Sequence, residues 1–207
     1  MNAIIKFKNL LVEALKGNRK LIIGLYLLFI VCFVAAWILS APKMQASHGN
    51  IPVSNNTEMD LGALDLFIHN ASSAIGIYLA SVLFAIPAFG MLIFDGASMG
   101  AMGPLFNSIM PNGGLFFIAY LIPHGIFEIT ASVIGSAAGV LLFLFVFRFA
   151  KAIIGSGADG ASDAFEKTKK PFIQSLVLLA FAIILLLVAA PIEAYVSVPL
   201  AEFVVVV

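Results

Sequence analysis

A histidine and a glutamate stand four residues apart inside a long apolar stretch, at His124 and Glu128. Residues four apart share one face of a helix, so if Pro123 is the first helical residue the imidazole can donate a hydrogen bond to the carboxylate. Such a pair could relay a proton, hold a cation or bind a polar group of a partner. An equally weighted alternative is a purely structural pair that fixes the start of the helix.

Other polar residues interrupt apolar runs and are further candidates for a functional polar site. Asn70, Asp95 and Asn112 are of this kind. Asp95 and Gly96 also fit a turn at the inner membrane boundary, because Asp-Gly is common in turns. Glu193 follows the last long apolar run, where a carboxylate is either interfacial or turned toward the centre of a helical bundle.

Motifs for enzymatic chemistry are absent from the sequence. There is no H-E-x-x-H, no G-x-S-x-G, no phosphate-binding glycine loop and no cluster of cysteine and histidine with zinc-ligand spacing. A single His with a single Glu makes a poor closed metal site. We therefore predict a protein that is not an enzyme, with no catalytic residue, no metal and no cofactor.

The composition is that of an integral membrane protein. Of 207 residues, 62% are apolar and 11% are charged, whereas a soluble domain carries about 25% charged residues. Eleven basic residues balance eleven acidic ones, so the sequence lacks the basic excess that nucleic-acid binding needs. The expected partners are the lipid bilayer and other membrane proteins.

The basic residues fall into two windows, which predicts the orientation of the chain. Five of them lie before residue 21, five lie at 148–170, and Lys43 is the exception. Basic residues near membrane spans concentrate on the cytoplasmic side. We therefore expect a multi-pass protein of the cell membrane with a cytoplasmic N-terminus, an even number of crossings between the two windows, and an external C-terminus.

The apolar runs predict an all-α membrane protein with about five transmembrane helices. Residues 1–20 have the pattern of a cytoplasmic amphipathic helix at the interface, 21–195 form one transmembrane domain, and 196–207 are an external tail. The expected spans are 21–41, 71–94, 105–122, 126–147 and 172–190.

The third span is expected to contain or border a helix break at Pro123-His124-Gly125. A residue before proline avoids the helical conformation, and glycine frees the backbone. Pro111-Asn112-Gly113-Gly114 is a second turn signal. Either 105–122 crosses as a broken helix or part of it is re-entrant and protected by neighbouring helices.

Small residues at four-residue spacing predict close helix packing. These positions are Gly96, Gly100, Ser132, Gly135, Ser136 and Gly139. We expect most of the contacts within one chain, and we also expect a homo-oligomer.

The sequence resembles a known family. The block Pro123-His124-Gly125-Ile126-Phe127-Glu128, with the small-residue run 135–139 after it, is similar to the signature of the stage II sporulation protein M family. Asn70, Gly96 and Gly100 also match that pattern, whereas Asp95 stands where Asn is expected and Val140-Leu141 replaces an Arg-containing continuation. The resemblance covers residues 65–195 and implies a polytopic membrane scaffold that recruits peptidoglycan-degrading partners during engulfment.

Two functions remain open on the sequence. In the first, the protein is a non-enzymatic scaffold or subunit of a membrane complex, and His124 and Glu128 fix the broken helix. In the second, it is a channel or transporter that passes an ion, proton or small polar solute along His124 and Glu128. The second requires a polar cavity that reaches both residues.

Overall fold

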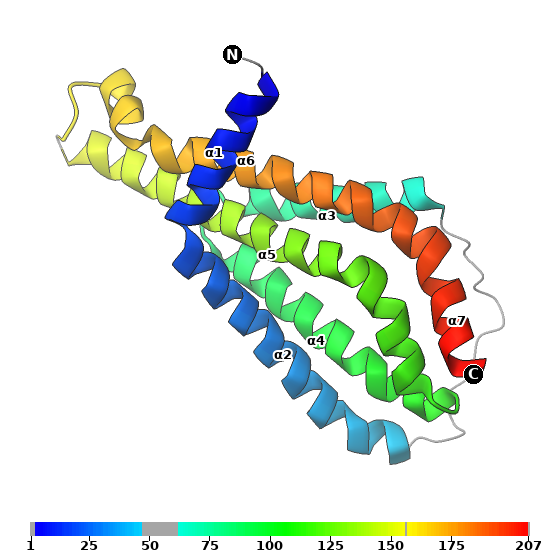
Figure 1. The fold of residues 1–207 in the computed structure, drawn as a ribbon. Coiled ribbons are helices and arrows are strands. Elements are labelled where there is room, and N and C mark those ends of the chain that lie inside the picture. The colour runs from blue at the N-terminus through cyan, green and yellow to red at the C-terminus, as the bar shows by residue number, and fades with distance from the viewer. Residues whose placement is uncertain (1–2, 47–61, 156, 207) are drawn as a thin grey trace.

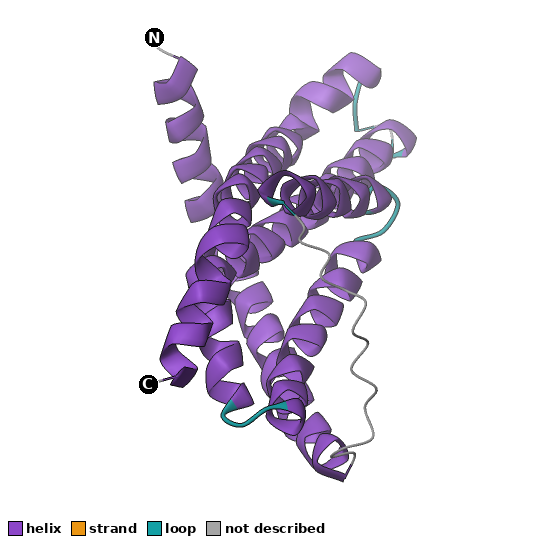
Figure 2. Cartoon of the chain, turned by 90° about the vertical axis from the view of Figure 1, so that its right-hand side faces the viewer, coloured by secondary structure: helices purple, strands orange, loops and turns teal. Residues whose placement is uncertain are grey.

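The computed structural model describes residues 3–46, 62–155 and 157–206. Within these ranges the chain forms helices joined by turns, without any strand (Figure 2). The elements are α1 (Ala3–Gly17), α2 (Arg19–Ala46), α3 (Ala63–Ala80), α4 (Ile86–Ile109), α5 (Gly113–Ile154), α6 (Ala161–Ile192), the π-helical segment η1 (Glu193–Ser197) and α7 (Val198–Val206). The predicted all-α architecture is confirmed, as expected for a chain whose backbone groups must be paired without water.

The long helices alternate in direction along the bundle (Figure 1). Helices α2, α4 and α6 run away from the end that carries α1, and α3 and α5 run back toward it. Four of these helices are long and apolar enough to cross a membrane, namely α2, α4, α5 and the helix that begins with α6. The fifth, α3, has 18 residues. The helix count roughly matches the expected five.

The two basic windows come together at one end of the bundle. Helix α1 lies across α6 (Figure 1), and Lys170 Nζ is 3.1 Å from a carboxylate oxygen of Glu13. Both side chains are exposed, so this ion pair contributes little stability. Helices α2 to α5 lie between the windows in the sequence, and α2, α4 and α5 are long and apolar enough to cross a membrane.

Glycines on α4 allow it to pack closely on α2. A Cβ added at Gly96 would lie 2.9 Å from the carbonyl oxygen of Phe29, and one added at Gly100 would overlap the backbone of Phe33. Small residues of this kind let two helix backbones approach each other. The contact lies within one chain.

Helices α5 and α6 form the core of the bundle, and α3 packs on them. Val133 and Ala137 of α5 and Leu178 and Ala182 of α6 are fully buried. The hydroxyls of Tyr78 on α3 and Ser175 on α6 are 3.0 Å apart and buried, which pairs two polar groups that burial would otherwise penalise.

The expected span 71–94 is not one helix. Helix α3 ends at Ala80, the chain turns through 81–85, and α4 starts at Ile86. Ser81 Oγ donates a hydrogen bond to the carbonyl of Ile77 at 2.8 Å, and Pro87 lies in the first turn of α4, where its missing N–H costs nothing. The turn was missed because it is apolar, and hydropathy does not distinguish an apolar turn from a helix.

Residues 105–122 do not form a span of their own either. Residues 105–109 complete α4, and the chain turns at 110–112 with Asn112 in the left-handed conformation (φ 55°). Helix α5 then begins at Gly113 and continues to Ile154, through Pro123.

The predicted break at Pro123-His124-Gly125 is a bend rather than an interruption. All three residues are helical, and α5 curves markedly in its N-terminal half (Figure 1). A proline inside a helix removes one hydrogen bond and displaces the preceding turn, which bends a helix that its neighbours hold on both sides.

The remaining expected segments fall inside longer helices, with one exception. Residues 21–41, 126–147 and 172–190 lie within α2, α5 and α6, and most of 1–20 is α1 and the start of α2. The segment 196–207 was expected as a tail, but its described part, 196–206, forms the end of η1 and α7, and α7 packs against α5. Ala201 is fully buried there, because the apolar composition of this segment favours packing over exposure.

The two glycines of the predicted G-x-x-x-G pair on α5 are expected to differ in their tolerance of a side chain. A Cβ at Gly139 would lie 2.9 Å from Ser81 Oγ and 3.1 Å from Ala88 Cβ, whereas at Gly135 the nearest atom is Ala182 Cβ at 3.9 Å. Gly139→Ala should therefore destabilise the protein by about 1–3 kcal/mol, and Gly135→Ala should be neutral or stabilise it by up to about 1 kcal/mol. Melting temperatures in detergent, measured side by side, test this difference, and equal values would contradict it.

Candidate functional site

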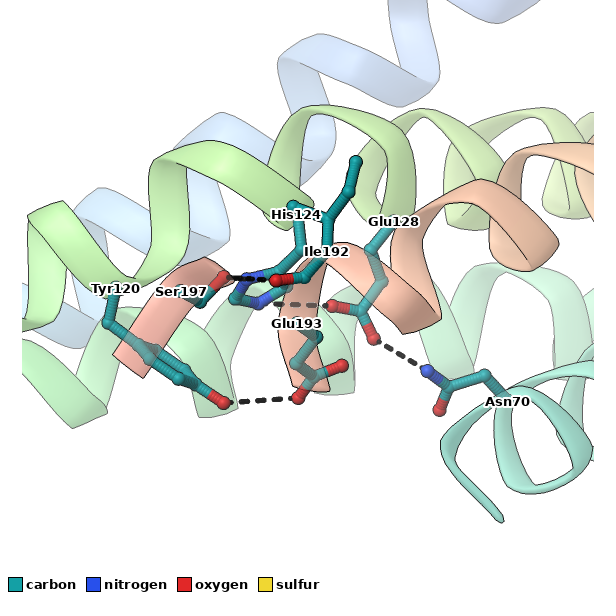
Figure 3. Close-up of polar contacts among 7 residues, drawn as sticks. All are labelled: Asn70, Tyr120, His124, Glu128, Ile192, Glu193 and Ser197. Carbon is teal, nitrogen blue, oxygen red and sulfur yellow. Dashed lines mark hydrogen bonds and ion pairs between the residues drawn. The ribbon is translucent and has the colours of Figure 1, made fainter. Parts of the chain in front are cut away.

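The site is centred on His124, one residue after the proline in the bend of α5. Its side chain is almost completely buried, with 2% exposed. Its Nδ1 lies 2.8 Å from Ser197 Oγ, on η1 (Figure 3). The Ser197 hydroxyl also lies 3.3 Å from the carbonyl oxygen of Ile192, and when it donates there its oxygen can accept a hydrogen bond from Nδ1–H. In that arrangement the imidazole is the neutral tautomer in which Nε2 carries the lone pair.

Glu128 lies one helical turn beyond His124 and faces it. The distance from His124 Nε2 to Glu128 Oε2 is 3.8 Å, which is too long for a hydrogen bond. The other oxygen, Oε1, accepts a hydrogen bond from Asn70 Nδ2 at 3.1 Å. Asn70 comes from α3, so three elements meet at this pair of side chains (Figure 3).

Glu193, the first residue of η1, brings a second carboxylate to the site. The Tyr120 hydroxyl donates to Glu193 Oε1 at 3.1 Å, and the Tyr120 ring packs edge-on against the His124 imidazole. One ligand atom each of His124, Glu128 and Glu193 lie within 4.8 Å of one another. We refer to these three residues as the His-Glu-Glu cluster.

A π-helical turn places Glu193 and Ser197 toward α5. The segment Glu193–Ser197 follows Pro191, which lies inside α6. A π-turn adds one residue to a helical turn, so it shifts the faces of the residues that follow, and such turns occur frequently at functional sites. For Glu193, the only signal in the sequence was a glutamate that follows a proline at the end of an apolar run. Tyr120 and Ser197 gave no signal that separates them from other residues of the bundle.

A cavity of about 250 Å³ opens beside the cluster, between α3, α4 and α5. Glu128 and Asn70 line it, as do Asp95 of α4 and Ser132 of α5. The Ser132 hydroxyl donates to Asp95 Oδ2 at 2.5 Å. Glu128 is the residue shared between the cavity and the cluster, with 21% of its side chain exposed.

The cavity lies well inside the helices that form it. Glu128 is fifteen residues from the first residue of α5, a distance of about 22 Å along a helix axis. No lysine or arginine occurs in the sequence between Lys43 and Arg148 or after Lys170. The site is therefore acidic, and the basic groups among the residues that line the cavity and form the cluster are the imidazole rings of His69 and His124.

The residues predicted from sequence are distributed over three places. The cavity lining includes Asn70, Asp95, Glu128, Ser132, Gly135 and Ser136, with His69 as an addition that the sequence reasoning missed. His124 contacts Glu128 but does not line the cavity, so the cavity reaches only one of the two residues that permeation along His124 and Glu128 was expected to require. Pro123 and Gly125 belong to the bend that orients His124.

Asn112 does not take part in the polar site. It occupies the turn between α4 and α5, and its left-handed conformation lets α5 begin at Gly113. The nearby Asn107 side chain accepts the backbone N–H of Gly114 at 2.6 Å, which satisfies one of the free donors at a helix start.

A family model described as stage II sporulation protein M matches residues 25–198. The chain belongs to the stage II sporulation protein M family. The matched range contains every residue of the site, from Asn70 to Ser197, and the resemblance seen in the sequence is confirmed. No curated protein and no solved structure matches the chain.

Family membership and the four long apolar helices make this stage II sporulation protein M homologue a multi-pass integral membrane protein. An ionisable side chain at membrane depth costs about 2.5–3.5 kcal/mol on insertion scales. Asp95, Glu128 and Glu193 all lie in or directly after the long apolar helices. The polar site therefore raises the free energy of inserting an otherwise apolar bundle into the membrane.

Proposed function

We propose that this family member is a non-enzymatic membrane protein that binds and passes a small cation or a proton. The observation that carries the proposal is the cavity of about 250 Å³ lined by Asp95 and Glu128. A scaffold needs neither a cavity nor two carboxylates in an apolar bundle, whereas a cation pathway past Glu128 uses both. The absence of lysine and arginine from these segments favours a cation over an anion.

The polar groups of the cavity suit a solute that exchanges hydrogen bonds as it moves. Hydroxyls and an amide accompany the carboxylates, and Ser132 and Asn70 each already donate to one of them. A cation that enters would replace these donors at the carboxylate oxygens without leaving a buried charge unpaired. The bend in α5 places Glu128 where the cavity and the His-Glu-Glu cluster meet, as helix irregularities do at transporter sites.

Flux measurements on reconstituted protein test this function. In liposomes that contain a pH-sensitive dye or a Na⁺-sensitive dye, wild-type protein should dissipate a proton or Na⁺ gradient, respectively, faster than protein-free liposomes do. Glu128→Gln and Asp95→Asn should each lower that rate about tenfold or more, because each removes the charge that stabilises the cation in the cavity. The matched control is Glu202→Gln, at an exposed glutamate of α7, which should keep the wild-type rate at equal protein per vesicle.

A second function, a scaffold or subunit of a membrane complex, has its own supporting observation. The hydrogen bonds around His124 and Glu128 join α3, α5 and η1, so the same residues have a structural role. In this function other membrane proteins, or a second copy of the chain, would bind its exposed apolar faces. Wild-type vesicles that carry neither proton nor Na⁺ flux would exclude the first function and leave this one.

The orientation that we propose has the N-terminus in the cytoplasm and the C-terminus outside. It is supported by the proximity of the two basic windows, where Lys170 pairs with Glu13, and by the charge preference of the cytoplasmic side.

A further inference from the structure

We propose that the His-Glu-Glu cluster binds one divalent transition-metal ion, with His124 Nε2 and one oxygen each of Glu128 and Glu193 as protein ligands. The three ligand atoms lie within 4.8 Å of one another. The sequence gave only two of them, which is why it predicted no metal. The inference does not depend on cation permeation, because a metal ion held here could equally stabilise a scaffold.

The first argument is that three atoms able to donate a lone pair to a metal ion lie close together. With the proton on Nδ1 and donated to Ser197, Nε2 carries a lone pair, and Nε2 faces Glu128 Oε2 at 3.8 Å. A lone pair on nitrogen repels a carboxylate oxygen, and a second carboxylate adds to the repulsion. A cation between them converts this repulsion into attraction.

The second argument is that each ligand is already held by a hydrogen bond at the atom that would not bind the metal. Ser197 holds Nδ1 of His124, Asn70 holds Oε1 of Glu128, and Tyr120 holds Oε1 of Glu193. These contacts leave Nε2 and the two Oε2 atoms for an ion (Figure 3). Metal-binding histidines and carboxylates are oriented by such outer partners.

The third argument is the distance between the ligand atoms. Two ligands bound at about 2.1 Å to one tetrahedral ion lie about 3.4 Å apart. The separation of 3.8 Å between His124 Nε2 and Glu128 Oε2 therefore needs only a small contraction. An oxygen of Glu193 supplies the third ligand atom, which lies within 4.8 Å of the other two.

The ligand set indicates the class of ion. A neutral imidazole nitrogen suits Zn²⁺ and its first-row neighbours, whereas Mg²⁺ and Ca²⁺ prefer oxygen ligands alone. Three protein ligands leave a fourth position for water or another group. The adjoining cavity, which reaches Glu128, provides the route by which an ion enters.

Equilibrium binding of Zn²⁺ to the purified full chain tests the proposal. After treatment with a chelator, wild-type protein in detergent should bind one Zn²⁺ per chain in competition with a fluorescent zinc indicator, and Mg²⁺ should not displace it. Glu193→Gln, which is nearly isosteric, should weaken the binding at least tenfold. Tyr120→Phe should weaken it about 10–100-fold, because it removes only an outer partner.

Two further variants separate ligation from folding. The exposed Glu202→Gln should bind Zn²⁺ as the wild type does. His124→Asn can keep a polar group at the position of Nδ1 but has none at Nε2, so it should fold without a nitrogen ligand for the metal. Co²⁺ can replace Zn²⁺ as a coloured probe, and it should absorb visible light when bound to the wild-type site. His124→Asn should lose this absorption.

The proposal is overturned if the wild type binds no stoichiometric Zn²⁺, or if Glu193→Gln and Glu202→Gln bind it equally. Gradient dissipation without Zn²⁺ binding would remove this inference and leave cation permeation standing. Zn²⁺ binding without flux would remove cation permeation and leave the metal site standing.

Discussion

Gly100→Ala is expected to destabilise the protein by about 3 kcal/mol or more through the contact between α2 and α4. A Cβ at this position would lie 2.8 Å from the carbonyl carbon and 2.9 Å from the Cα of Phe33. These are backbone atoms, which cannot move aside as the end of a flexible side chain can, so the two helices would have to separate. Overpacking that is relieved by the movement of side chains typically costs about 1–3 kcal/mol. We expect a larger cost when two helices must move apart.

Gly90 provides the matched control on the same helix. A Cβ there would have no atom within 4 Å. Gly90→Ala should therefore leave the stability unchanged or raise it by up to about 1 kcal/mol, because alanine favours the helix. Thermal unfolding of both variants in the same detergent is the measurement. Similar melting temperatures for Gly100→Ala and Gly90→Ala would show that α2 and α4 do not pack as described.

His124→Ala is expected to lower stability by about 3 kcal/mol and to release the C-terminal segment. The ring is buried, so its removal leaves a cavity, and Ser197 loses its partner in α5. A large-to-small change in a core and an unpaired buried hydroxyl each carry a cost of this order. The released segment should become sensitive to protease around η1 while α5 and α6 stay protected.

Two substitutions at the same position distinguish the hydrogen bond from the ring volume. Asparagine can place a polar atom near the position of Nδ1 and so keep the contact with Ser197, whereas glutamine resembles the histidine at Nε2. His124→Asn should therefore recover protease resistance at the C-terminus better than His124→Gln. If both behave as His124→Ala does, the contact with Ser197 is not what holds η1 against α5.

Local patterns in the sequence were sufficient to predict one part of the site. His124 and Glu128 face the same side of a helix because they are four residues apart, and this holds whether the proline ends the helix or bends it. The same reasoning could not place Asn112, because a glycine-rich turn and a polar site look alike when only neighbours in sequence are known. Small residues likewise predicted close packing on α4 without indicating α2 as the partner.

Boundaries within apolar stretches were the weakest part of the sequence reading. The turn at 81–85 contains the apolar residues Val82, Leu83 and Phe84, and the proline at position 123 lies inside a continuous helix. Hydropathy measures preference for lipid, and it does not report whether the backbone turns. The charge distribution required an even number of crossings between the two basic windows, and the helices found there have different boundaries from the expected spans.

The sequence by itself determined the environment of the chain, its helical class, its family resemblance and the pairing of His124 with Glu128. All of these follow from composition or from spacing along one helix. Only the tertiary structure decided that Glu193, 65 residues beyond Glu128, completes the cluster and that Asp95 and Asn70 share a cavity with it. Such contacts arise from how α3, α5 and the end of α6 pack on one another, and packing depends on the shapes of surfaces that no single stretch of sequence contains.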